Sequence, residues 1–328
     1  MAVNRVLYAT QTANVFTGGT GVTGFTTRRP YTLPTQSANA DETIPQDDVL
    51  VLGKLGGVAR LQKDVASCKA SLKFYMCQSI TVDESGAGHN ASGWLQANRK
   101  DGEINGNLLR DFLKTTIAAA QAGVNDRVIV DSSGTGLANS ADGFYMDGIV
   151  NSIGIDASKG AFPMIDMAWE GVGRLQSLNM GTAATLVSSN GGDWHITEAN
   201  PITSKEVVVS SATNDTVANV KFSYDLPTET LSRLGGVILG NSATVAGDNQ
   251  QFSKPPYKAT MTADGQSLAG VAGGWGTACS VTFGTTTTLI ASISAAGLNI
   301  STKSFGQNVG DVGATFSVTA EGTEATFA

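Results

Sequence analysis

Three glycines near the N-terminus, Gly19, Gly21 and Gly24, have the G-x-G-x-x-G spacing of a dinucleotide-binding turn. Such a turn needs a helix directly after it, because the helix N-terminus then meets the pyrophosphate. Here the next ten residues, 25–34, contain two prolines, which prevent a helix from forming. The chain has no G-K-[ST] sequence, which excludes a P-loop. We therefore predict no cofactor and no cofactor-binding residue.

Histidines and carboxylates offer little catalytic chemistry either. The two histidines, His89 and His195, stand far apart, and neither belongs to an H-E-x-x-H sequence or a Cys/His cluster. No G-x-S-x-G sequence marks a nucleophile. Acidic pairs such as Asp83–Glu84 have a spacing that suits a solvated face as well as acid–base catalysis. We predict no catalytic residue, no metal site and no enzyme activity.

The three cysteines, Cys68, Cys77 and Cys279, form no C-x-x-C pair and are odd in number. In a chain of this length, that usage indicates buried thiols in a reducing compartment rather than a disulfide framework. A Cys68–Cys77 bridge stays open as an alternative if the two residues fall on adjacent strands.

Charge and hydropathy narrow the class of protein further. Only 15% of the 328 residues are charged, against about a quarter in an average globular protein. This deficit suggests that much of the surface contacts other protein. The net charge of −7 disfavours electrostatic binding to nucleic-acid phosphates. We expect neither a signal peptide nor a membrane-spanning segment, because no long apolar run is present.

Apolar residues mostly recur with a period of two, which predicts antiparallel β-strands. Strands are predicted over residues 70–76, 207–209, 217–222, 281–283 and 315–318, and in the first of these Leu72, Phe74 and Met76 would share one face. The exception is residues 107–122, where apolar residues at helical spacing predict a single amphipathic helix. Asn107 suits the N-cap of this helix, and Gly123 suits the position just after its end. The helix is expected to cover one face of a sheet.

Four stretches rich in Gly, Pro and small polar residues predict long loops: 17–48, 83–106, 131–143 and 241–277. Loops of this length in a compact domain usually bind something or become ordered by a partner.

Two pairs of similar strings occur in the same order along the chain, which suggests an internal duplication. Residues 52–58 (LGKLGGV) resemble residues 231–237 (LSRLGGV), and residues 154–171 resemble residues 297–322. We therefore predict two β modules. The first spans residues 1–180 and includes the helix at 107–122 and an N-terminal arm at 17–48, and the second spans residues 181–328.

Three stretches resemble the strand patterns of the major tail tube proteins of long-tailed, siphovirus-like bacteriophages: residues 49–76, 144–171 and 297–322. In that family, a strand, a G-x-F-P turn and a second strand ending in E-G form part of a β-sandwich. Residues 160–163 (GAFP) and 170–171 (EG) match this pattern, whereas the second half lacks the proline. The resemblance covers about half of the chain and depends on strand patterns, not on a diagnostic motif.

The resemblance implies a mainly β fold with one flanking helix, a β-sandwich of tail-tube type in two copies. Subunits of that family pair strands into rings with an inner β-barrel, and the rings stack into a tube that conducts DNA without binding it specifically. Two modules in one chain favour a trimeric ring with pseudo-sixfold symmetry, and a hexamer is the alternative. The implied location is the virion tail, assembled in the bacterial cytoplasm, and the implied partners are tape-measure, tail-terminator and distal tail proteins. Alternatives are a capsid-decoration protein, a tail-tip protein or a carbohydrate-binding β-domain.

Candidate interface residues follow from the predicted arm. We expect Arg28, Arg29, Tyr31, Asp47 and Asp48 to contribute to contacts between stacked rings, with the two arginines as ion-pair donors. The repeated glycines are expected at equivalent turns or bulges that require glycine. They are Gly56, Gly57, Gly235 and Gly236.

Overall fold

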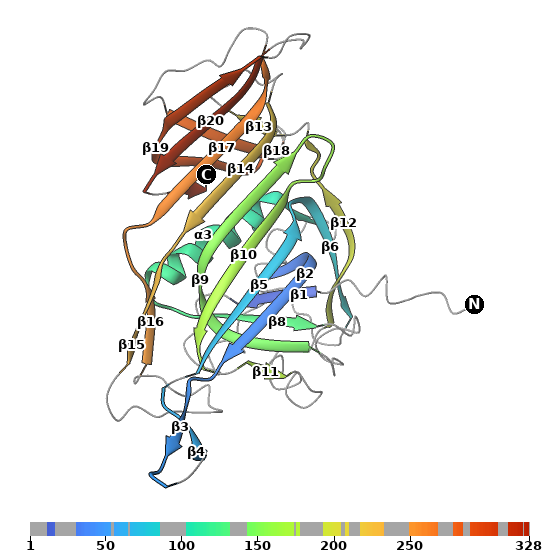
Figure 1. Cartoon of the computed structure of the whole chain (residues 1–328). Coiled ribbons are helices and arrows are strands. Elements are labelled where there is room, and N and C mark those ends of the chain that lie inside the picture. The colour runs from blue at the N-terminus through green and yellow to red at the C-terminus, as the bar shows by residue number, and fades with distance from the viewer. Residues whose placement is uncertain are drawn as a thin grey trace, which may run out of the picture.

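The computed structural model describes only part of the chain in detail. The described residues are 12–16, 31–53, 56–64, 66–85, 103–131, 143–173, 175–177, 193–204, 207–209, 217–232, 249–267, 278–284, 289–307, 314–323 and 325–327. In these residues the protein is mainly β, with a large antiparallel sheet and the single helix α3 (Figure 1).

Eight strands lie side by side as one continuous sheet, from blue and green at lower right to red at upper left in Figure 1. In spatial order they are β2 (Tyr31–Thr43), β5 (Ser67–Tyr75), β10 (Met164–Val172), β9 (Gly143–Ser158), β14 (Val217–Asp225), β17 (Lys258–Ser267), β20 (Ala314–Gly322) and β19 (Leu289–Gly306). All neighbouring pairs are antiparallel. In the described residues this sheet is open and does not close into a barrel.

The remaining strands extend or flank this sheet. β1 (Thr12–Phe16) and β8 (Asp126–Asp131) pair with each other and with the N-terminal parts of β2 and β9. β13 (Val207–Val209) and β18 (Ala278–Gly284) continue the sheet beyond β19. The short strands β11 (Gln176–Ser177) and β21 (Thr326–Phe327) pair back onto β9 and β19.

Three smaller units complete the fold. β6 (Cys77–Ser85) pairs with β7 (Glu103–Asn105) and with β12 (Asp193–Pro201). β3 (Gln46–Leu50) and β4 (Gly57–Gln62) form a hairpin between β2 and β5, and β15 (Thr228–Ser232) and β16 (Asn249–Ser253) form one between β14 and β17. β12 lies after the predicted module boundary at residue 180 but pairs with a strand of the first half.

The strand order occurs twice. In chain order, β2, the β3–β4 hairpin, β5, β8, β9, β10 and β11 match β14, the β15–β16 hairpin, β17, β18, β19, β20 and β21. β6, β7 and α3 are additional elements between β5 and β8 of the first half. Even the irregularities correspond. One extra residue bulges from β9 at Asn151 and from β19 at Ser301, and one bulges from β2 at Gln36 and from β14 at Ala218. Bulges are specific features of a strand pair, so their repetition supports an internal duplication.

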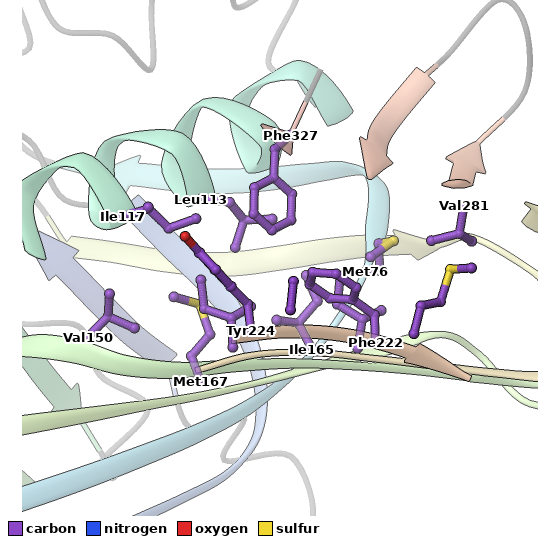
Figure 2. Close-up of a cluster of buried hydrophobic side chains, with 14 of the residues drawn as sticks. Met76, Leu113, Ile117, Val150, Ile165, Met167, Phe222, Tyr224, Val281 and Phe327 are labelled. Atoms are coloured by element: carbon purple, nitrogen blue, oxygen red, sulfur yellow. The ribbon is translucent and has the colours of Figure 1, made fainter. Parts of the chain in front are cut away.

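Helix α3 (Gly106–Gln121) covers the sheet where the two halves meet. Its predicted apolar face is buried at Phe112, Leu113, Thr116, Ile117 and Ala120. Figure 2 shows Leu113 and Ile117 above Met167 of the first half and Tyr224 of the second half, with Phe327 of the second half beside Leu113. The helix starts one residue before the predicted range and ends before Gly123, whose φ of 66° is left-handed as predicted. One core therefore spans the two repeats.

The strand predictions over 70–76, 207–209, 217–222, 281–283 and 315–318 are confirmed, and Leu72, Phe74 and Met76 are buried together. Two loop predictions are wrong. The stretch 17–48 contains β2 and most of β3, and the stretch 241–277 contains β16 and β17. In β2 and β17 the inward positions are largely alanines, with little apolar contrast to their small polar neighbours. The period of two was therefore too faint to recognise.

Candidate assembly interface

The two faces of the eight-stranded sheet differ sharply. Inward side chains pack beneath α3, whereas the opposite face carries alternating polar and charged side chains from every strand. Its charged groups, over the paired residues, are four lysines and seven carboxylates: Lys69, Lys73, Lys221, Lys258, Asp41, Asp156, Asp166, Glu170, Asp225, Asp264 and Glu321. Three cross-strand ion pairs, Lys69–Glu170, Lys221–Asp156 and Lys258–Glu321, partly balance this excess of negative charge. We call this surface the polar face.

The two halves are joined edge to edge by β9 and β14, a junction we call the internal seam. Its register aligns Tyr224 with Ile153 and Phe222 with Ile155. These four side chains are at most 2% exposed. On the polar face, Lys221 Nζ lies 3.9 Å from Asp156 Oδ2 across the seam. The seam therefore combines a buried apolar side and a solvated charged side, as a permanent protein interface does.

The hairpin β15–β16 also crosses the seam. Thr228 Oγ1 at its base donates a 2.7 Å hydrogen bond to Glu170 Oε2 of β10. A hairpin of the second half is thus fastened to a strand of the first half.

In the repeat, β2 corresponds to β14 and β19 corresponds to β9, and these two strands lie at the two ends of the eight-stranded sheet. In the described residues, β2 over 35–43 pairs only with β5, and β19 over 302–306 pairs only with β20. Within these described ranges, each strand has a partner strand on one side only. Such edges invite pairing with another chain unless they are protected. The inward positions on these edges are poorly covered, and Phe305 of β19 is 55% exposed.

A second exposed apolar surface lies on the β3–β4 hairpin, which projects from the end of the sheet (Figure 1). The tip carries four successive apolar residues, Val49 to Leu52, with Leu50 76% exposed and Leu52 fully exposed. A protruding apolar tip of this kind is typical of a segment that inserts into a partner.

The candidate interface residues can now be placed in part. Asp47 and Asp48 lie on β3, where Asp47 pairs with Lys63 at 3.1 Å and Asp48 with Arg60 at 3.3 Å. Both ion pairs stay within the hairpin unit and are well exposed, so each contributes little to stability. Tyr31 is the first residue of β2, and Arg28 and Arg29 lie outside the described residues.

Of the repeated glycines, only the first pair lies in the described residues, in the β3–β4 hairpin unit. Gly57 pairs with Leu50 beside a register shift, and Gly56 precedes it. Neither has a left-handed φ, and a Cβ at Gly56 would meet nothing within 4 Å. The glycine requirement in this turn lies instead at Gly53, whose φ is 89°. Gly235 and Gly236 lie outside the described residues.

The cysteines, histidines and potential metal ligands can also be located within the described residues. The described part of the chain holds no group of three or more potential metal ligands, and none of its helices is long and apolar enough to cross a membrane. Cys68, Cys77 and Cys279 are buried thiols and not disulfide-bonded, so the Cys68–Cys77 bridge left open above is not formed. The backbone of His195 lies in β12, and His89 lies outside the described residues.

The residues that sequence analysis missed are those of the two open edges, β2 and β19. The internal repeat could have identified them, because aligning the two halves gives each strand of the internal seam a counterpart at an end of the sheet.

A scan against known protein families finds no model that matches this chain, and a search of characterised proteins finds no relative.

Proposed function

We propose that this protein is the structural subunit of a bacteriophage tail tube, in which three copies form a ring and rings stack into a tube that conducts DNA. The observation that supports this function best is the internal seam. Two copies of one four-stranded unit are already joined edge to edge, and in the described residues the equivalent edges, β2 over 35–43 and β19 over 302–306, have a partner strand on one side only. A head-to-tail contact that repeats the seam generates a ring if the rotation closes.

In this proposal the polar face lines the bore. Its carboxylates outnumber its lysines, so it would repel the phosphates of passing DNA rather than retain them. The apolar tip of the β3–β4 hairpin, together with Arg28 and Arg29, would contact the next ring. The inner barrel is formed only between copies, which agrees with the open sheet of the single chain.

Negative-stain electron microscopy of the purified chain tests this function directly. We expect uniform tubes or rings with a central hole. A mass measurement on isolated rings should give three chains, and six would show that each chain contributes one unit. A chain that stays monomeric at high concentration would contradict the proposal and favour a decoration or carbohydrate-binding domain.

A further inference from the structure

The internal seam predicts which residues meet when two copies associate. At the internal seam, β9 of the first half pairs with β14 of the second half. In an assembled ring, their counterparts should pair in the same way, β19 of one copy with β2 of the next. The bulges and the strand registers align the two halves residue by residue. Ser301 corresponds to Asn151, which makes Lys303 and Phe305 the counterparts of Ile153 and Ile155.

The other edge is aligned in the same way. Gly171 lies opposite Cys68, and Gly322 lies opposite Ala259, so the two strands β5 and β17 correspond. Their neighbours β2 and β14 then align so that Thr43 corresponds to Asp225. Ala40 is therefore the counterpart of Phe222, and Glu42 is the counterpart of Tyr224.

From this alignment we propose a specific seam between copies of this chain, in which Glu42 lies opposite Lys303 of the next copy and Ala40 lies opposite its Phe305. This inference rests on the proposed ring and adds the strand pair, its register and its chemistry. On the polar face the same register places Asp41 opposite Ser304.

The chemistry of the paired positions fits this register. Tyr224 and Ile153, which meet inside the chain, are replaced at the open edges by Glu42 and Lys303, which carry opposite charges. Both side chains are half-buried in the single chain. At the next position, a large residue on β19, Phe305, meets a small one on β2, Ala40, where its exposed ring would be covered.

The charges also explain how the edges stay soluble before assembly. Inward-pointing charged residues are a common protection of edge strands, because pairing with an unrelated strand would bury them without a partner. In the proposed register, Glu42 and Lys303 of two neighbouring copies lie opposite each other with opposite charges. The ion pair therefore selects both the partner and the register, much as polar residues set register in other assemblies.

Cysteine cross-linking tests the register. We expect Asp41→Cys combined with Ser304→Cys to form intermolecular disulfides on mild oxidation, giving dimers and closed trimers on a non-reducing gel. Residues directly opposite in an antiparallel pair have Cα atoms about 4.5–5.5 Å apart, and a disulfide spans Cα distances of about 4.4–6.8 Å. The matched control, Asp41→Cys with Thr302→Cys, lies two residues out of register and should cross-link at least tenfold more slowly. Asp41→Cys alone should give no dimer.

Two cross-linking results and one result on the association of the wild-type chain would overturn the proposal. Rings that form but cross-link faster in the Thr302→Cys control would refute the register alone. A dimer from Asp41→Cys alone would show that two β2 edges meet, which a closed head-to-tail ring excludes. A wild-type chain that never associates would refute the ring as well as the seam.

Charge reversal tests the chemistry of the seam. Glu42→Lys and Lys303→Glu should each reduce ring formation at least tenfold, and the double variant should restore it. Lys159→Glu, in the exposed turn after β9, is the control for the charge change and should assemble normally. The thermal midpoint of each dissociated subunit should stay unchanged. If the single reversals assemble normally or better, or the double variant stays defective, the proposed ion pair is wrong.

Discussion

At the scale of single residues, the first half is held together by a few close contacts where β8, β9 and β10 meet. The guanidinium of Arg127, which is 1% exposed, donates two 2.6 Å hydrogen bonds to Asp147 and lies over the Tyr145 ring. Trp169 Nε1 donates a 2.9 Å hydrogen bond to Asp126. A buried, bidentate pair of this kind fixes one arrangement of the strands, because breaking it leaves a charge without compensation.

Gly171 lies in this region, at a position where no side chain fits. A Cβ there would overlap the carbonyl oxygen of Asp147 and lie 3.0 Å from Cys68 Sγ. We predict that Gly171→Ala lowers the free energy of unfolding by about 1–3 kcal/mol or more, as overpacking does. Urea unfolding of the dissociated subunit measures this loss. Gly56→Ala is the matched control, since a Cβ there meets nothing within 4 Å. Equal effects of the two variants would contradict the prediction.

The cysteines give a second prediction at this scale. Burial raises the pKa of Cys68 and Cys77 to about 12 and that of Cys279 to about 11. Because the thiolate is the reactive form, the folded chain should react slowly with a thiol reagent at pH 8, and all three thiols should react after unfolding. Above pH 9 the unfolded thiols lose protons that the folded ones keep, so stability should fall as pH rises. Rapid labelling of the folded chain would show that these side chains are accessible.

At the scale of elements, the two hairpins of the repeat have different surroundings. The β15–β16 hairpin is fastened to the first half through Thr228 and Glu170, whereas the tip of β3–β4 is exposed. In a ring that repeats the internal seam, β3–β4 would reach toward the second half of the neighbouring copy. Its apolar tip, beyond that contact, is free to meet the next ring.

We therefore predict that Leu50→Ser combined with Leu52→Ser prevents tube growth but permits single rings. Because both side chains are exposed, the free energy of unfolding of the variant should lie within about 0.5 kcal/mol of the wild-type value. Electron microscopy distinguishes rings from tubes. The control is Val208→Ser, a change at another exposed apolar residue, on β13. Normal tubes from the double variant would exclude this tip from stacking contacts.

Helix α3 illustrates how one element can serve two repeats. It lies between β7 and β8 of the first half, yet Figure 2 shows it above Phe222, Tyr224 and Phe327 of the second half. Phe222 and Phe327 pack edge to face, with their ring centres 6.1 Å apart. The helix therefore stabilises the internal seam directly.

At the scale of the whole molecule, part of the net negative charge can be assigned to one surface, the polar face. The polar face carries seven carboxylates and four lysines, and ring formation would gather three such faces around one bore. Like charges in a confined channel act together over distances comparable to the screening length, about 8 Å at physiological salt.

The bore should therefore release DNA readily. We predict that wild-type tubes do not co-sediment with DNA at physiological salt, and that tubes of a variant with Asp156→Lys, Asp166→Lys and Asp264→Lys do. Asp64→Lys combined with Glu229→Lys, at two exposed carboxylates outside the polar face and outside the expected stacking residues, provides the control for positive charge added elsewhere. DNA retention by both variants alike would place the polar face outside the bore.

Much of the fold was predictable because apolar contrast is strong in it. The helix and the strands β5, β14 and β20 have bulky residues at regular spacing, and all were expected near their actual positions. β2 and β17 were missed, since alanines fill inward positions such as Ala38, Ala40, Ala259 and Ala263. The candidate interface was predicted least well. Its edges depend on which strands find partners, and strand pairing is not local in the sequence.

The amino-acid sequence by itself determined the β-rich class, the amphipathic helix and the existence of a repeat, because each is a matter of local spacing or similarity. Only the tertiary structure decided that the repeats join edge to edge through β9 and β14, beneath one shared helix. It also decided which edges remain open. Hydrogen-bonded register is set by contacts between residues far apart in the chain, where one-residue shifts would turn every side chain to the wrong face.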